Sequence, residues 1–168
     1  AKRGISMEKL NQRHSKMLTA LCSVSYYVSY LTRTNFAAII TAIIQTGIIE
    51  KTAAGMVTTM GFITYGIGQL ISGWLGDRIN PKKLMFAGFI TTAVMNFIIP
   101  FCPNGITMCV VWGINGFAQS LMWPPMVKIM STAMDTDTYN KSCVSVTLGS
   151  TLATVSIYLI APLVISLF

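Results

Sequence analysis

A long apolar stretch runs from Met17 to Ile49 and reads MLTALCSVSYYVSYLTRTNFAAIITAIIQTGII. Arg33 is its only charged residue, and most of the others are apolar or small. A helix that crosses a bilayer needs about 20 mainly apolar residues. The stretch therefore predicts one long transmembrane helix over about 17–43. A polar loop at 50–52 follows, in which Thr52 is the expected N-cap of the next helix.

The composition of the whole chain agrees with this prediction. Of its 168 residues, 53% are hydrophobic and only 10% are charged, whereas a soluble globular domain carries about 25% charged residues. Twelve Lys and Arg against five Asp and Glu give a net charge of +7. These basic residues lie in short breaks between apolar stretches and form no patch, which argues against a nucleic-acid partner. The expected partner is a lipid bilayer.

Four further apolar stretches follow the first, separated by breaks that contain Pro, Asn, Asp and Lys. The predicted spans are about 17–43, 53–76, 84–99, 106–130 and 142–168. Pro81 is expected to end helical structure in the second break, and Pro124 and Pro125 to kink the fourth span. The runs are too long and continuous for barrel strands. The predicted fold class is an all-α membrane protein, a polytopic helical bundle with five transmembrane helices.

Orientation follows from the positions of the basic residues. Residues 1–16 form a short basic segment, and this segment and the breaks at 77–83 and 128–141 hold all Lys and Arg except Arg33 and Lys51. Because cytoplasmic loops are enriched in Lys and Arg, the N-terminus is expected in the cytoplasm of a cell (inner) membrane. The chain begins with Ala1 and ends in an apolar run. We therefore expect a fragment of a longer protein, with Met7 as a candidate original start.

The polar residues offer no catalytic set. All five acids lie in breaks, and the single histidine, His14, lies in the polar start. The four cysteines lie in apolar segments without a CxxC motif, so they indicate neither a disulfide nor a metal site. We expect no enzyme activity, no metal and no other cofactor.

Arg33 is the residue that points to a function. A guanidinium in the middle of a span costs about 2.5–3.5 kcal/mol by insertion scales, and no acid of the chain lies at its depth. Arg suits phosphate or carboxylate because its planar fork donates two parallel hydrogen bonds. The favoured interpretation is a cation that binds an anionic ligand. The alternative is a shifted helix whose Arg33 reaches the outer interface.

Helical spacing places further polar and aromatic side chains on stripes. Tyr26, Tyr30 and Arg33 share one face of the first span. Tyr65 and Gln69 share a face of the second, as Asn115, Gln119 and Trp123 do in the fourth. Such stripes are typical of a polar cavity. They are also compatible with an interfacial aromatic belt and with ordinary hydrogen bonds between helices.

Three segments in order resemble a known family. The sequence GWLGDRINPKKL at 73–84 looks like the loop signature between helices two and three of the major facilitator superfamily. Together with YLTRTNF at 30–36 and NGFAQSLMWPP at 115–125, it is similar to the organophosphate:phosphate antiporters, which include glycerol-3-phosphate and hexose 6-phosphate transporters and related sugar-phosphate sensors. The resemblance runs from about Tyr26 to Val146. It implies about twelve helices in the complete protein, so this chain would be most of the N-terminal half.

The resemblance also implies roles for individual residues. In that family the first-helix arginine, matched by Arg33, binds the substrate phosphate together with an arginine from the other half. The loop motif implies a gating role for Gly73, Asp77, Arg78 and Lys82. Two departures leave the substrate open. Gln69 stands where glycerol-3-phosphate transporters carry a lysine, and the position of a fifth-helix histidine falls near Thr151. The expected substrate-binding set is Arg33, Tyr26, Tyr30, Tyr65, Gln69, Gln119 and Trp123.

Three functions remain open at this point. The first is a secondary transporter that exchanges an organophosphate for inorganic phosphate by alternating access, or carries another organic anion. The second is a membrane sensor of extracellular sugar phosphate on the same fold, and the third is a stand-alone five-helix scaffold. On the expected cytoplasmic face, we predict that Arg78 or Lys82 lies within salt-bridge distance of Asp135 or Asp137.

Overall fold

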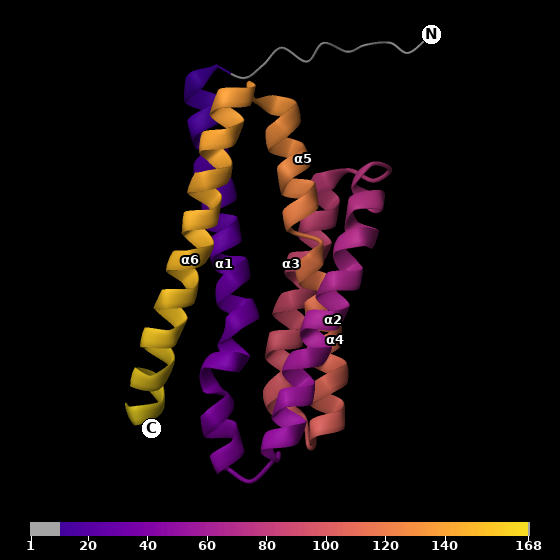
Figure 1. Ribbon diagram of the computed structural model, residues 1–168, viewed down its shortest axis with the longest axis vertical. Coiled ribbons are helices and arrows are strands. Elements are labelled where there is room, and N and C mark those ends of the chain that lie inside the picture. Colours follow the sequence, from indigo (N-terminus) through magenta and orange to yellow (C-terminus); the bar gives the residue numbers. More distant parts are fainter. Residues whose placement is uncertain (1–10, 168) are drawn as a thin grey trace.

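The computed structural model describes residues 11–167, which form a bundle of helices without strands (Figure 1). The chain is helical over most of this length because the apolar stretches are long and every proline except Pro162 lies at the start of a helix or in a loop. The elements are α1 (Gln12–Gln45), α2 (Lys51–Gly76), α3 (Pro81–Ile98), the 3₁₀ turn η1 (Ile99–Phe101), α4 (Gly105–Ser120), α5 (Trp123–Ala133) and α6 (Thr136–Leu167).

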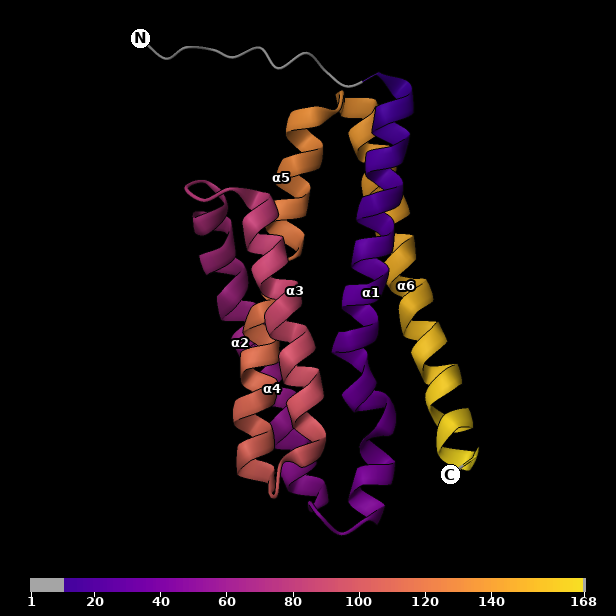
Figure 2. The ribbon, with the colours of Figure 1, turned by 180° about the vertical axis from the view of Figure 1, so that it is seen from behind.

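The helices form two groups. The long helices α1 and α6 pack side by side, and α2 packs along α4 with α3 on the other side of α4. The view from behind shows the same separation (Figure 2). Helix α5 continues from α4 and contacts α1, α2, α3 and α6. It therefore joins the two groups near the end of the bundle where α1 begins, which we call the N-terminal end.

The predicted fourth span is two helices. Helix α4 ends at Ser120 and α5 starts at Trp123, with Pro124 and Pro125 in its first turn. Proline has no N–H to donate, and the first turn of a helix is where that loss is tolerated. The kink expected at the two prolines is therefore a complete break.

Two expected helix boundaries were wrong. Thr52 is not the N-cap of α2, because the helix already starts at Lys51 with Glu50 in the cap position. Pro81 does not lie in the break but is the first residue of α3, after Asn80, whose side chain accepts a hydrogen bond from the Lys82 backbone N–H at 3.0 Å. A capping Asn followed by Pro favours the start of a helix. The proposed start Met7 lies outside the described residues.

Two apolar clusters occupy opposite ends of the bundle. The cluster at the N-terminal end joins α1, α5 and α6 through Cys22, Tyr26, Met126, Met130, Met134 and Val146. The cluster at the other end joins α1, α2 and α4 through Phe36, Ile49, Ala54, Val57, Cys102, Met108 and Trp112. Between the two clusters α1 carries Ser29, Thr32, Arg33 and Asn35. The core thus has a polar layer between two apolar layers.

The outer surface of the bundle is apolar. Large side chains such as Leu70, Phe86 and Leu148 are more than half exposed, which is unusual for a surface that faces water. Two segments, Pro81–Phe101 and Thr136–Leu167, are long and apolar enough to cross a membrane. The other three predicted spans stay predictions.

Helices α2 and α4 approach closely at glycines. A methyl group at Gly116 would overlap the backbone carbonyl oxygen of Gly61 and lie 2.5 Å from the Thr64 hydroxyl. The same contact brings Trp112 of α4 against Gly61 of α2. Small residues at such crossings let two helix backbones come together. Gly61 and Gly116 therefore have a packing role at this crossing.

We predict that Gly116→Ala separates α2 from α4. Alanine is the better helix former by up to about 1 kcal/mol, but the clash with the Gly61 backbone should outweigh this gain and destabilise the fold by about 1–3 kcal/mol. Thermal unfolding of the purified chain in detergent measures the change. Gly66→Ala on α2 is the matched control, because a methyl group there meets no atom within 4 Å. Equal melting temperatures for the two variants would contradict the prediction.

Candidate functional site

The side chain of Arg33 extends from α1 toward α2 in the polar layer. Its guanidinium carbon is 3.7 Å from the ring centroid of Tyr65, 5.4 Å from that of Tyr30 and 6.0 Å from that of Phe62. The negative face of an aromatic ring attracts a cation over this distance range. Among the described residues, the ion pairs involve other side chains. Arg33 is therefore held by aromatic rings and has no carboxylate partner there.

The predicted aromatic stripe comes together beside Arg33. The rings of Tyr26 and Tyr30 lie 5.0 Å apart in an edge-to-face arrangement, and Tyr26 lies 5.0 Å from Trp123 of α5. Arg33 and Tyr30 of the first predicted stripe therefore lie beside Tyr65 of the second. Its role in substrate binding stays a prediction.

Amide and hydroxyl side chains connect three helices through the polar layer. Asn35 of α1 donates a hydrogen bond to Asn96 of α3 at 2.6 Å, and Asn96 donates to Asn115 of α4 at 3.3 Å. One turn away, Ser29 donates to the Gln119 side-chain oxygen at 2.5 Å, and the Gln119 amide nitrogen donates to Thr32 at 3.1 Å. Both polar atoms of Gln119 are thus bound to α1.

The two glutamines of the predicted site differ in their surroundings. Gln119 is 2% exposed and is fully paired, so in this structure it positions α1 against α4 instead of lining a cavity. The amide nitrogen of Gln69 on α2 is buried and makes no hydrogen bond to the described residues. A buried donor without a partner is costly, and this makes Gln69 the better candidate for contact with a ligand.

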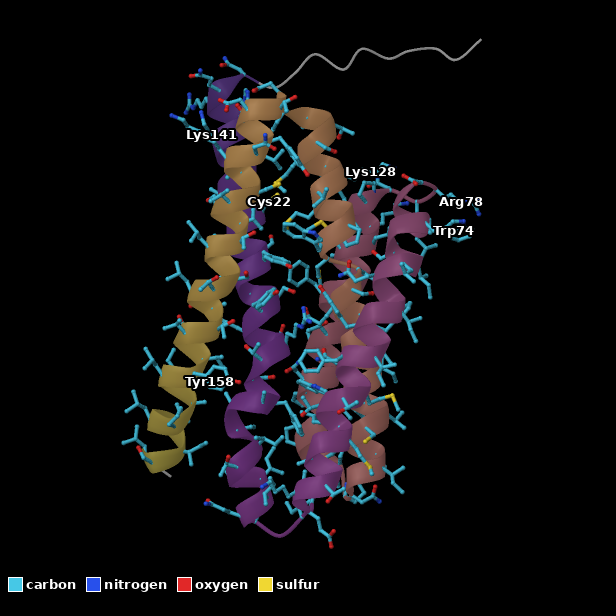
Figure 3. The ribbon with its side chains drawn as sticks, in the orientation of Figure 1. Cys22, Trp74, Arg78, Lys128, Lys141 and Tyr158 are labelled. Carbon is cyan, nitrogen blue, oxygen red and sulfur yellow. The ribbon has the colours of Figure 1, made fainter. Side chains whose placement is uncertain are left out.

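A small cavity opens next to Arg33 between α1, α2 and α4. Its volume is about 130 Å³, and its lining includes Arg33, Phe36, Phe62, Trp112, Asn115 and Tyr158. Tyr158 comes from α6 and is half-exposed (Figure 3). The arrangement of one cation, several aromatic rings and a few polar groups is typical of a small-molecule site. Within residues 11–167 no group of three or more His, Cys, Asp or Glu side chains could hold a metal ion.

Several site residues were not identified from the sequence. Asn35, Asn96 and Tyr158 belong to no predicted stripe, although an amide inside an apolar span is a signal in itself because it needs a partner there. The remaining predicted positions lie at the N-terminal end of the bundle. A methyl group added at Gly73 would meet no atom within 4 Å, and Arg78 stacks on Trp74 with its guanidinium carbon 3.8 Å from the ring centroid (Figure 3).

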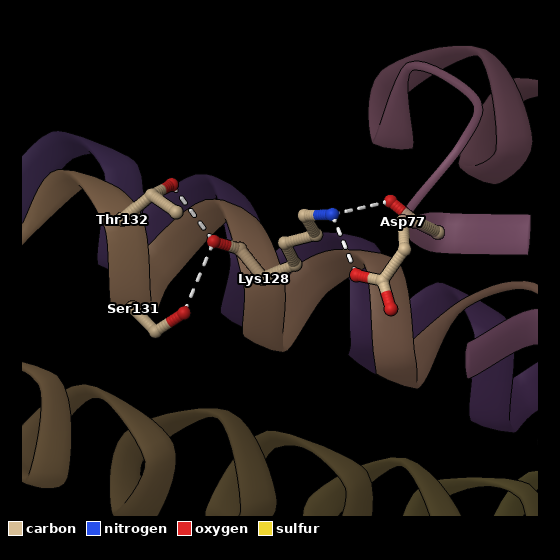
Figure 4. A network of polar contacts seen from close by, with 5 residues as sticks. Asp77, Lys128, Ser131 and Thr132 are labelled. Carbon is tan, nitrogen blue, oxygen red and sulfur yellow. Dashed lines mark hydrogen bonds and ion pairs between the residues drawn. The ribbon is translucent and has the colours of Figure 1, made fainter. Parts of the chain in front are cut away.

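The predicted ion pairs between the loops were wrong. Arg78 and Lys82 do not pair with Asp135 or Asp137. Asp77 pairs instead with Lys128 of α5 at 2.8 Å, and the Lys128 ammonium also donates to the Gly76 carbonyl at 2.7 Å (Figure 4). The tertiary fold decides this choice, because α5 places Lys128 at the end of α2. We call this contact the Asp77–Lys128 clamp.

The two acids near the start of α6 have local partners. Asp137 pairs with Lys141 one turn along α6 at 2.7 Å. Asp135 accepts a hydrogen bond from the Thr138 backbone N–H at 3.0 Å, and this N-cap interaction holds the pKa of its carboxyl below the usual value. These partners explain why neither acid reaches the α2–α3 loop.

The clamp changes the electrostatics of Asp77. The hydrogen bond from Lys128 and the charge of its ammonium lower the pKa of the Asp77 carboxyl. A lowered pKa means that the folded state is favoured at pH values above the ordinary carboxyl pKa, and that this contribution is lost as the pH falls through the lowered value. Since Asp77 is exposed, the contribution to stability is small, and the clamp chiefly orients the ends of α2 and α5.

Comparison with known proteins identifies the class. The family described as Major Facilitator Superfamily matches residues 22–168, so the chain belongs to this superfamily. The superfamily is one of transporters and is not enzymatic in general. No solved structure matched the chain.

Individual members of the superfamily are also similar to the chain. The chain is 29% identical over 108 residues to "Membrane sensor protein UhpC" of Escherichia coli (strain K12), with 64% of the chain and 25% of that protein covered. It is 30% identical over 108 residues to the "Probable hexose phosphate transport protein" of Chlamydia trachomatis, with 64% and 24% covered. It is 32% identical over 112 residues to the "Glycerol-3-phosphate transporter" of Bacillus subtilis, with 64% and 25% covered. The matched segment thus spans about a quarter of the length of these relatives.

We predict that Lys128→Gln raises the pKa of the Asp77 carboxyl toward its ordinary value near 3.8, because the cationic donor is lost. Carboxyl ¹³C NMR titration of the purified chain measures the shift. Lys141→Gln is the control and should leave Asp77 unchanged, since Lys141 pairs with Asp137. If both variants titrate Asp77 like the parent, the clamp does not form in solution.

Proposed function

We propose that the chain is part of the N-terminal half of a secondary transporter that exchanges an organophosphate for inorganic phosphate. On this proposal the five predicted spans cross the membrane, with α4 and α5 together forming the fourth. The N-terminal end of the bundle faces the cytoplasm, because the basic breaks at 77–83 and 128–141 lie there. The missing helices of the other half complete the substrate cavity.

The observation that carries the proposal is the environment of Arg33. A guanidinium in a span costs free energy unless it meets an anion or water, and the described residues supply aromatic rings and no carboxylate. The Tyr65 ring lies 3.7 Å from the guanidinium carbon, and the N–H groups along the edge of the guanidinium donate no hydrogen bond to the described residues. A phosphate monoester fits this edge because it accepts two parallel hydrogen bonds.

Other residues of the predicted site would contribute to the substrate cavity. Tyr26, Tyr30 and Trp123 form an aromatic wall toward the cytoplasmic end, and the unpaired amide nitrogen of Gln69 is available to a bound oxygen. The relatives named as hexose phosphate and glycerol-3-phosphate transporters support a phosphorylated ligand. Gln69 adds no positive charge, so Arg33 is the main source of anion affinity in this half.

Transport also requires that the site open to each side in turn. In this superfamily fold we propose that the two halves rock as rigid bodies around the site. The Asp77–Lys128 clamp would keep α2 and α5 together during that motion. It lies at the N-terminal end of the bundle, away from Arg33, so it would affect the rate of exchange more than ligand affinity.

A sensor of phosphorylated sugars is the second candidate, because one relative is named a membrane sensor. The same Arg33 site would then bind the ligand and pass a conformational change to a partner protein. Flux separates the two functions. In proteoliposomes a transporter exchanges labelled inorganic phosphate, whereas a sensor binds the ligand with little exchange.

We predict that Arg33→Gln abolishes binding of phosphorylated ligands to the full-length protein. Loss of two charge-assisted hydrogen bonds, each worth about 1.5–3 kcal/mol, corresponds to at least about 100-fold weaker binding. Arg33→Lys keeps the charge but loses the fork, and binding should weaken by about tenfold or more. Calorimetric titration with inorganic phosphate and glycerol 3-phosphate measures both.

Arg13→Gln is the matched control for this experiment. It removes an exposed arginine at the start of the same helix and should leave ligand affinity unchanged. Arg33→Gln should also insert into membranes as well as the parent, because a charge within a span opposes insertion. Parent-like affinity of the Arg33→Gln protein would remove the basis of the proposed anion site.

We predict further that Asp77→Asn slows exchange while ligand affinity stays nearly constant. The change breaks the clamp with Lys128 but does not alter the Arg33 site. Exchange of labelled phosphate in proteoliposomes, measured beside equilibrium binding, distinguishes the two effects. An equal loss of rate and affinity would place Asp77 in the binding site and would contradict its role in the clamp.

A further inference from the structure

The cavity beside Arg33 is lined by polar groups that the proposed binding of phosphate to Arg33 does not use. Asn115 of α4 accepts a hydrogen bond from Asn96 through its side-chain oxygen, but its amide nitrogen donates to none of the described residues. The Tyr158 hydroxyl likewise has no hydrogen-bond partner within residues 11–167. The two side chains line the same cavity of about 130 Å³ as Arg33.

The other hydroxyl groups of the cavity are already used. Thr34 donates to the Tyr30 carbonyl at 2.7 Å, and Thr58 donates to the Ala54 carbonyl at 3.1 Å. Both are ordinary bonds to the preceding helical turn. Asn115 and Tyr158 thus differ from them in keeping polar groups available to a bound molecule.

Aromatic side chains form the apolar wall of the cavity. The rings of Phe36 and Trp112 lie 5.0 Å apart and are almost fully buried, at 2% and 6% exposure. Phe62 of α2 borders the cavity as well. A polyol chain presents hydroxyl groups in some directions and C–H groups in others, so it matches a wall with both hydrogen-bonding groups and aromatic surface.

We propose that this cavity is a subsite for the hydroxylated part of the substrate, with Tyr158 and Asn115 as specificity-determining residues. The inference rests on the proposed function, since Arg33 must hold the phosphate for the rest of the ligand to reach the cavity. Asn115 donates its amide N–H to one substrate hydroxyl, and the Tyr158 hydroxyl exchanges a hydrogen bond with another. The preferred ligands are therefore phosphate esters of polyols or sugars, and esters of simple alcohols bind less tightly.

The position of Tyr158 adds a link between the two groups of helices. Tyr158 is on α6, whereas Asn115 is on α4, and the cavity lies between α1, α2 and α4. A ligand that contacts both residues connects the α1–α6 pair with the α2–α4 pair. The subsite thus binds the hydroxylated part of the ligand only when the α1–α6 pair and the α2–α4 pair are correctly placed relative to each other.

The test compares three ligands on the full-length protein in lipid nanodiscs: inorganic phosphate, glycerol 3-phosphate and propyl phosphate. Propyl phosphate has the same number of carbons as the glycerol ester but lacks its hydroxyl groups. A loss of one hydrogen bond of about 1.4 kcal/mol is a tenfold change in affinity. Propyl phosphate lacks both hydroxyl groups that Asn115 and Tyr158 would bind, so we expect the parent to bind glycerol 3-phosphate about 100-fold more tightly than propyl phosphate.

Tyr158→Phe removes only the hydroxyl of a half-exposed side chain, so the fold should be kept. The variant should lose about tenfold of the preference for glycerol 3-phosphate, because the Asn115 hydrogen bond remains, while its affinities for propyl phosphate and inorganic phosphate stay within about twofold of the parent. Tyr27→Phe is the matched control, because it removes a hydroxyl that bonds Ser156 of α6 at 3.0 Å and lies outside the cavity lining. It should keep the parental preference.

The outcomes separate this inference from the proposed function. An unchanged preference in Tyr158→Phe, or an equal weakening of all three ligands, overturns the subsite while leaving the Arg33 anchor in place. Parent-like binding of all three ligands by Arg33→Gln overturns the anchor itself, and with it the subsite. A reduced preference in Tyr158→Phe together with loss of all binding in Arg33→Gln supports both.

Discussion

Polar groups inside an apolar bundle must find partners within the bundle, and this constraint organises the middle of the structure. An unsatisfied backbone or side-chain group in hydrocarbon costs several kcal/mol, whereas a formed interhelical hydrogen bond in a membrane protein contributes on average only about 0.6 kcal/mol. The hydrogen bonds from Asn35 to Asn96 and from Asn96 to Asn115 therefore add little to the stability of the fold. Their main effect is to fix how the helices are aligned along one another. A helix that slides by one turn leaves these amides unpaired.

The polar layer and the two apolar clusters have different roles in the fold. Apolar side chains at each end pack α1 against its neighbours, and glycine contacts bring α2 and α4 together. Arg33 stands apart from both arrangements, because its guanidinium contacts rings and no carboxylate among the described residues. The contacts of Arg33 among the described residues therefore do not offset the free-energy cost of a cation in an apolar span.

The break between α4 and α5 connects this middle layer to the N-terminal end. Helix α4 carries Asn115 and Gln119, which pair with α3 and α1, while α5 carries Trp123 against Tyr26 and Lys128 against Asp77. The two prolines in the first turn of α5 let it leave the axis of α4. One predicted span therefore supplies contacts to the polar layer and to the α2–α3 loop.

Much of this protein follows from local sequence. The length of the apolar runs predicted where the helices lie, although α1 and α6 begin earlier than expected and the fourth span divides into α4 and α5. The spacing of Tyr26, Tyr30 and Arg33 predicted which side chains share a face, because helical periodicity is a property of neighbouring residues. The short motifs were sufficient to indicate the superfamily. The choice of partners was decided only by the tertiary structure. Lys128 pairs with Asp77, Asn96 joins Asn35 to Asn115, and Tyr158 reaches the cavity of Arg33, because each contact depends on how separate helices cross, and helical periodicity carries no information about that crossing.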